Sequence, residues 1–173
     1  MLLALLKTIV PAIYAVYLLL PALRHLHSHA PRGWNALLAR LSRDWSARHL
    51  SDHFLWQEGL SATPENVWQL LEGPRGLCVI FRNTGVLLAM ADYATRNNPC
   101  VDPMMLANLR SDAMQIRLCV LMALLQYGFS HLSEGVRVNS LRAASLYTAM
   151  AARMTCLLQD HAAGILPAFV EAM

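Results

Sequence analysis

The sequence is short of charged side chains, and its N-terminal quarter contains no acid. Only 14% of the 173 residues are charged and 56% are hydrophobic, whereas soluble domains average about 25% charged and about 45–50% apolar residues. No Asp or Glu precedes Asp44, and Lys7 is the only lysine. A surface so poor in charge predicts contact with lipid or with other proteins. The net charge of +3 gives no indication of nucleic-acid binding.

Paired cysteines and catalytic motifs are also missing. The cysteines lie far apart without a C-x-x-C motif, which predicts free, mostly buried thiols at Cys78, Cys100, Cys119 and Cys156. The chain has no G-x-S-x-G motif, no phosphate-binding loop and no dinucleotide fingerprint. Its carboxylates are scattered rather than paired for acid–base work. We therefore expect no enzymatic activity and no cofactor.

Histidines form two groups that we weighed as ligands. The first group is His25, His27 and His29, and the second is His49 and His53, which are spaced i, i+4. Two histidines at that spacing can share a metal or serve a haem. No acid or cysteine accompanies the first group, and the second lacks the Glu of a zinc-hydrolase motif. We expect histidines at the surface or at headgroup level, with a haem or metal protein as the weaker alternative.

The first apolar segment predicts a membrane anchor. Leu2 to Leu23 contains one charge, Lys7, and about 20 apolar residues suffice to span a bilayer. No small-residue cleavage site with a polar mature start follows, so we expect a retained transmembrane helix. A buried hairpin or a peptide in another protein's groove is the alternative. Residues 1–30 are thus predicted to be an anchor and hinge, and residues 31–173 a helical domain.

A short basic amphipathic helix is predicted after the hinge. Apolar side chains recur at i, i+3, i+4, i+7 and i+11, at Trp34, Leu37, Leu38, Leu41 and Trp45. Such a helix suits the membrane interface, but it suits a core-facing position equally well.

Two further helices are predicted before residue 97. Thr63-Pro64-Glu65 is a helix start, with an N-cap, a proline at N1 and an acid in the first turn, and the helix stops at Gly73-Pro74. Leu77 to Ala94 is predicted to be helical, because the strand-like segment Cys78–Phe81 has no partner strand elsewhere.

Two long helices are predicted after that. Pro103 to about Glu134 carries a heptad-like apolar seam, is expected to be central in the bundle, and is predicted to end at Gly135; its seam is Leu106, Leu109, Ala113, Ile116, Val120, Ala123 and Tyr127. The last helix, from about Ser140 to Asp160, has a stripe for close packing at Ala144, Thr148, Ala152 and Cys156. Gly164 and Pro167 are predicted to end it before a short tail. The expected class is all-α, with about four helices in the bundle.

Three arginines interrupt apolar helices and need partners. Arg82, Arg117 and Arg153 would pair with Asp92, Asp112 or Asp160, or would face a lipid headgroup or an acidic neighbouring subunit. The candidate residues for lipid or partner binding are Arg24, Arg32, Trp34, Arg40, Arg43, Trp45, Arg82, Arg117 and Arg153.

These features predict a non-catalytic, membrane-anchored accessory subunit of a large membrane protein complex. The expected location is the mitochondrial inner membrane, in a respiratory-chain or ATP-synthase assembly, with other subunits as partners. Positive charge after the anchor places the helical domain on the matrix or cytoplasmic side. The alternative is a stand-alone membrane-shaping or anionic-lipid-binding protein, and no nucleic-acid partner is expected.

Overall fold

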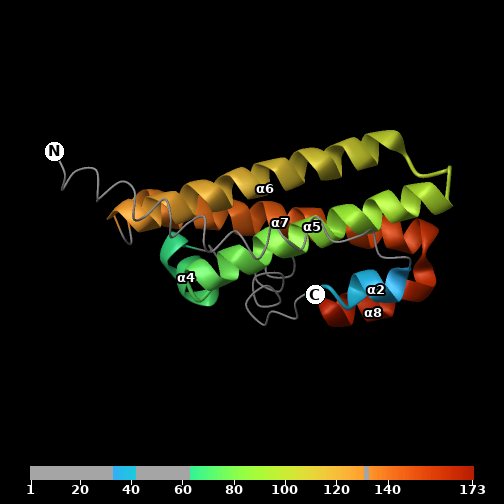
Figure 1. Ribbon diagram of the computed structural model, residues 1–173, viewed down its shortest axis with the longest axis horizontal. Helices are drawn as coiled ribbons and strands as arrows, with labels where there is room; N and C mark the ends of the chain where they lie inside the picture. The colour runs from blue at the N-terminus through green and yellow to red at the C-terminus, as the bar shows by residue number, and fades with distance from the viewer. Residues whose placement is uncertain (1–32, 42–62, 131–132) are drawn as a thin grey trace.

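The computed structural model describes residues 33–41, 63–130 and 133–173. These residues form helices and no strand: α2 (Trp34–Leu38), α4 (Pro64–Leu70), α5 (Pro74–Asn97), α6 (Pro103–Ser130), α7 (Glu134–His161), the short 3-10 helix η1 (Ala163–Ile165) and α8 (Leu166–Ala172) (Figure 1). The all-α prediction is confirmed for the described residues. The transmembrane helix and hinge predicted for residues 1–30 lie outside them.

Helix α7 is the centre of the bundle. It packs against α4, α5, α6 and α8, whereas α6 packs against α5 and α7. Small and flexible residues let α7 accept neighbours on several sides, and its fully buried positions include Ala143, Ala144, Met150 and Met154. The prediction that the helix beginning at Pro103 is central is therefore wrong. That helix, α6, lies along one side of the bundle (Figure 1).

The apolar seam predicted on α6 is confirmed. Six of its seven side chains are buried, from Leu106 to Ala123. The seventh, Tyr127, is half-buried, with its ring centroid 5.4 Å from that of Trp68 on α4. The seam faces α5 and α7.

The predicted start of α4 is confirmed, and a tight turn joins α4 to α5. The Thr63 hydroxyl oxygen accepts a hydrogen bond from the Asn66 backbone N–H (3.4 Å). Glu72 and Gly73 then take positive φ angles of 53° and 70°, a region that glycine adopts at little cost. The Gly76 N–H donates to the Leu71 carbonyl oxygen (3.0 Å). Helix α5 begins at Pro74 and contains the segment Cys78–Phe81, which is helical as predicted.

The boundary between α6 and α7 differs from the prediction. Helix α7 begins at Glu134 rather than near Ser140, and the Ser133 side chain accepts a hydrogen bond from the Val136 N–H (3.4 Å). Gly135 therefore lies in the first turn of α7 and does not end α6. A Cβ at Gly135 would lie 2.8 Å from Oε1 of Gln126 on α6, so this glycine permits close packing rather than terminating a helix.

The C-terminal residues also differ from the prediction. Residues 166–172 form α8, and Pro167 lies in its first turn, where the missing N–H costs nothing. The predicted small-residue stripe on α7 is half right, because Ala144 and Thr148 are buried while Cys156 is exposed. The side chains of Phe169 and Ala172 on α8 are buried.

The described part of the basic amphipathic helix faces the core. Leu37 and Leu41 are buried, and the Trp34 ring meets Tyr93 of α5 edge-on, with 4.9 Å between centroids. Helix α2 ends at Leu38, and Trp45 lies outside the described residues. For residues 34–41, the core-facing alternative is the one that the structure supports.

Helix α5 is the one helix among the described residues that is long and apolar enough to cross a membrane. However, 61% of its apolar window is buried inside the fold, and the core helix of a soluble protein has the same length and composition. Its length and composition are therefore weak support for a membrane span.

We predict that Gly76→Ala destabilises the fold. The added Cβ would lie 2.1 Å from the Leu71 carbonyl oxygen, so the turn between α4 and α5 would have to open. We expect a loss of about 2–4 kcal/mol in the free energy of unfolding, measured by urea titration of the helical circular dichroism signal. The matched control is Gly164→Ala, whose Cβ meets nothing within 4 Å. Equal stability of the two variants would contradict the prediction.

Candidate interaction surface

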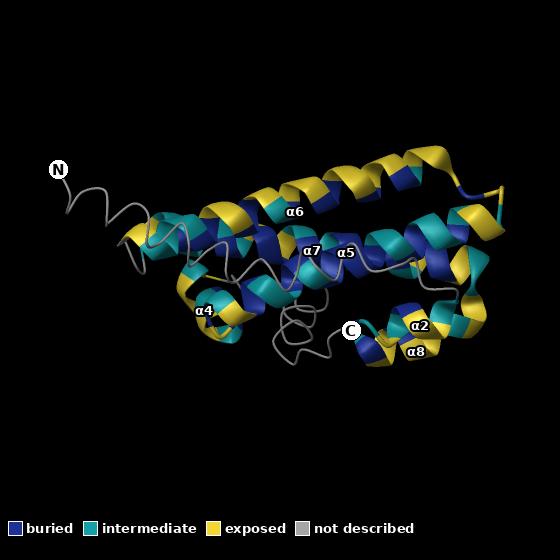
Figure 2. Cartoon of the chain, in the orientation of Figure 1, coloured by how far each residue is buried: buried dark blue, intermediate teal, exposed yellow. Residues whose placement is uncertain are grey.

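One side of α6 exposes large apolar side chains to solvent. We define the α6 outer stripe by its exposed members and their exposed fractions: Met114 (73%), Leu118 (58%), Leu121 (36%), Met122 (42%) and Phe129 (55%). Their steps of four, three, one and seven residues place them on one face of a helix. Figure 2 shows exposed residues along the side of α6 that is turned away from α5 and α7.

The α6 outer stripe runs from the middle of the helix to its C-terminal end. At 1.5 Å per residue, the fifteen steps from Met114 to Phe129 extend about 22 Å. Before Met114, α6 exposes Met104 (72%) in its first turn, and the exposed residues between these two methionines are small or polar: Ala107, Asn108, Arg110 and Ser111. The Gln115 amide, beside Met114, donates to the Ser111 hydroxyl (3.3 Å). A contiguous apolar patch of this kind on a helix surface marks an interaction site.

Arg117 lies at the edge of the stripe nearer to α5. It follows Met114 by three residues and precedes Leu121 by four, so it neighbours both on the helix surface. Its guanidinium carbon lies 5.5 Å from the ring centroid of Phe81 on α5, a cation–π distance. Its Nε is buried and has no hydrogen-bond partner among the described residues. Burial lowers the pKa of Arg117 below its ordinary value, yet arginine keeps its charge in proteins.

A second cation, Arg142, lies on the α7 side of α6. Arg142 is exposed, and its charge acts on the thiol of Cys119 on α6. Burial raises the pKa of the Cys119 thiol above its ordinary value, and the Arg142 charge partly opposes that rise. Arg117 thus neighbours the stripe, Arg142 lies close enough for its charge to act on Cys119 of α6, and none of the described residues that α6 exposes is acidic.

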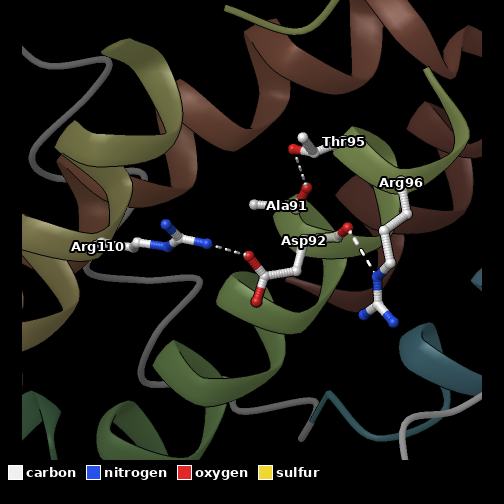
Figure 3. A network of polar contacts seen from close by, with 5 residues as sticks. All are labelled: Ala91, Asp92, Thr95, Arg96 and Arg110. Carbon is white, nitrogen blue, oxygen red and sulfur yellow. Dashed lines mark hydrogen bonds and ion pairs between the residues drawn. The ribbon is translucent and has the colours of Figure 1, made fainter. Parts of the chain in front are cut away.

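Two other arginines at the same helix interfaces are held by internal ion pairs. Arg110 of α6 donates to the Asp92 carboxylate of α5 (2.9 Å), and the Arg96 Nε donates to the Asp92 backbone carbonyl oxygen (3.2 Å) (Figure 3). Arg153 of α7 pairs with the carboxylate of Asp112 of α6. Internal carboxylates therefore already occupy Arg110 and Arg153, in contrast to Arg117.

The candidate residues predicted from the sequence have different surroundings in the structure. Arg153 has the internal partner, Asp112, that was one of the predicted alternatives, whereas Asp92 pairs with Arg110. Arg82 is half-buried on α5, with a buried Nε that has no hydrogen-bond partner among the described residues. Trp34 and Arg40 lie at the two ends of residues 34–40, and both are half-buried. Arg24, Arg32, Arg43 and Trp45 lie outside the described residues, and lipid or partner binding by these residues stays a prediction.

The sequence reasoning missed the exposed members of the α6 outer stripe. The signal was present, because α6 is apolar on more than the one face that carries its buried seam. An excess of this kind is typical of a helix at the centre of a bundle, which is the position that the sequence predicts. The alternative, a peripheral helix with an uncovered apolar face, follows once α7 is known to be the centre.

Other chemistry-bearing residues do not gather into a site in the described part of the chain. No group of three or more His, Cys, Asp and Glu side chains in residues 33–41, 63–130 and 133–173 could hold a metal ion. All four cysteines are free, as predicted, but they are not mostly buried: Cys100 and Cys156 are exposed, Cys78 is half-buried and Cys119 is buried. His49 and His53 lie outside the described residues.

Comparisons with protein-family models, curated proteins and solved structures find no match to this chain.

We predict that Arg153→Ala destabilises the bundle more than Arg142→Ala does. The Asp112 side chain is only 11% exposed, so removing Arg153 leaves a largely buried carboxylate without its cation. Because the Arg153 side chain is itself 44% exposed, we expect a loss of about 1–3 kcal/mol in unfolding free energy, less than for a fully buried pair. The exposed Arg142 should change stability by no more than about 0.5 kcal/mol. Urea unfolding of both variants checks this, and a neutral Arg153→Ala would contradict it.

Proposed function

We propose that the protein is a non-catalytic, membrane-anchored accessory subunit of a large membrane protein complex. In this proposal the α6 outer stripe packs against another subunit. The observation that carries the proposal is the stripe itself, five exposed apolar side chains on a helix whose remaining sides meet α5 and α7. Interfaces of permanent complexes are more apolar than ordinary protein surface, and their partners cover such patches.

The energetic argument is that covering the stripe is favourable. Burying apolar surface stabilises by roughly 25 cal/mol per Å². Met and Leu predominate in the stripe, and flexible methionine side chains adapt to a partner's shape. The described helices already share one hydrophobic core without these five side chains, so the gain from covering them is available to a binding partner.

The membrane part of the proposal comes from the sequence. Leu2 to Leu23 has the length and apolar composition of a spanning helix, and no acid precedes Asp44. We propose the mitochondrial inner membrane as the location, with a respiratory-chain or ATP-synthase assembly as the complex. The low charge of the whole chain supports extensive contact with other subunits.

We predict that Met114→Glu releases the protein from the complex and that Met104→Glu does not. Both methionines lie on α6 and are almost equally exposed (73% and 72%), but only Met114 belongs to the stripe. A carboxylate buried in an apolar contact is costly, so the complex-bound fraction of Met114→Glu should fall by about tenfold or more. The measurement is native electrophoresis of tagged full-length protein in mild detergent.

Two other outcomes of the electrophoresis would contradict this prediction. Unmodified protein that migrates alone, as a monomer or small homo-oligomer, would overturn the accessory-subunit proposal. Equal behaviour of the two glutamate variants would place the contact elsewhere on the molecule. Circular dichroism of each variant establishes that both remain folded.

A second candidate function is binding to an anionic lipid surface. It is favoured by Arg117, which neighbours the stripe, by the exposed Arg142 of α7, whose charge acts on Cys119 of α6, and by the lack of acids among the described residues that α6 exposes. Flotation with phosphatidylcholine vesicles, with and without phosphatidylserine, tests it directly. Binding that requires phosphatidylserine and is lost in the double variant Arg117→Gln/Arg142→Gln would support lipid binding, and equal flotation with both vesicle types would exclude the electrostatic version.

A further inference from the structure

We propose that the α6 outer stripe receives one apolar α-helix of another protein, and that this helix carries a carboxylate that pairs with Arg117. The inference rests on the proposed function, since it specifies the partner that an accessory subunit would meet. It adds two properties of that partner: its shape, a single helix, and its charge, an acid at a defined position.

The first argument is the size and position of the stripe. Its length of about 22 Å corresponds to four helical turns, which matches one helix–helix contact. A helix that lies in a membrane interface presents an apolar face along its whole length. On α6 the exposed residues between Met104 and Met114 are Ala107, Asn108, Arg110 and Ser111, so large apolar side chains do not follow one another along the whole length of the helix.

The second argument is the state of Arg117. Three other arginines on the long helices have internal carboxylates: Arg110 has Asp92, Arg153 has Asp112, and Arg137 has Glu65 (2.5 Å). Arg117 instead lies over the Phe81 ring, without an ion pair to a described carboxylate. Its Nε is buried without a hydrogen-bond partner among the described residues, a state that it shares with the Nε of Arg82 and of Arg137, but Arg137 has its carboxylate through another nitrogen. Arg117 is half-buried, and a carboxylate on a partner matches the donor geometry of its guanidinium.

The third argument concerns a second copy of this chain as the occupant. None of the described residues that α6 exposes is acidic, and Arg110 is already paired with Asp92 of α5, so Arg117 is the α6 cation that needs an acid from a partner. Packing two α6 helices against each other would supply Arg117 with no acid from the facing helix, which disfavours the contact. The charges therefore favour a different chain that supplies the acid.

The experiment is site-specific photo-crosslinking of full-length protein in cells. Benzoylphenylalanine replaces Leu118, which lies at the centre of the stripe beside Arg117, and in a parallel sample it replaces Met104, on the same helix outside the stripe. Mass spectrometry then identifies the crosslinked peptide. We expect an adduct from position 118, and not from position 104, to an apolar helical segment with an Asp or Glu within one turn of the crosslink.

Charge exchange then tests the pairing. Arg117→Glu should lower the crosslinking yield at position 118 by about tenfold or more, because one partner of a desolvated charge pair is lost. Arg117→Lys should retain most of the yield. Replacing the partner's acid by Arg should restore the yield of Arg117→Glu, a rescue that a purely structural effect of the substitution would not produce. Arg75→Gln, at an 84% exposed side chain away from the stripe, is the control.

Several outcomes would overturn the inference. They are an adduct to lipid alone, an adduct to a second copy of this chain, a protein segment without an acid near the crosslink, no adduct, or failure of the charge exchange to restore the yield. Native electrophoresis of the same samples distinguishes failure of this inference from failure of the proposed function. Protein that migrates with a large complex but fails the crosslinking test refutes the inference and leaves the proposed function standing, whereas protein that migrates alone refutes both.

Discussion

The fold depends on how closely the two other long helices, α5 and α6, can approach α7. Close approach requires small residues where the axes are nearest, and α7 supplies Ala143 and Ala144 without exposed surface. With neighbours on several sides, α7 has no free apolar face. The helices around α7 can keep an uncovered apolar face, because α7 covers each of them on one side only. For α6 this leaves a second apolar face that the described residues do not cover.

Local sequence signals were sufficient for elements whose ends have one physical cause. Thr63-Pro64-Glu65 begins α4 because the cap, the proline and the acid all favour the same helix start. The buried seam of α6 was also predictable, since its spacing follows from helical geometry alone. The all-α class followed because the β-branched segment at Cys78–Phe81 had no second strand to pair with.

Structural features whose sequence signal has two physical meanings were predicted less well. Gly135 reads as a helix terminator, but its role is to let Gln126 approach the first turn of α7. Pro167 reads as a helix breaker, but proline is equally suited to the first turn of α8. For α6, periodicity shows that the helix is apolar on more than one side, but not which sides its neighbours cover. That depends on the order of packing in space, and so the candidate interaction surface could be found only in the structure.

One polar contact in the core helps to align α5 with α7. The buried Asn83 amide of α5 donates to the Tyr147 hydroxyl of α7 (3.2 Å). Apolar side chains alone allow two helices to pack in several registers of similar energy. A slide of α5 by one turn along α7 would break this hydrogen bond between two buried residues, at a cost of about 0.5–1.5 kcal/mol. The pair therefore favours one register of α5 against α7 and thereby fixes where Phe81 of α5 lies along the bundle.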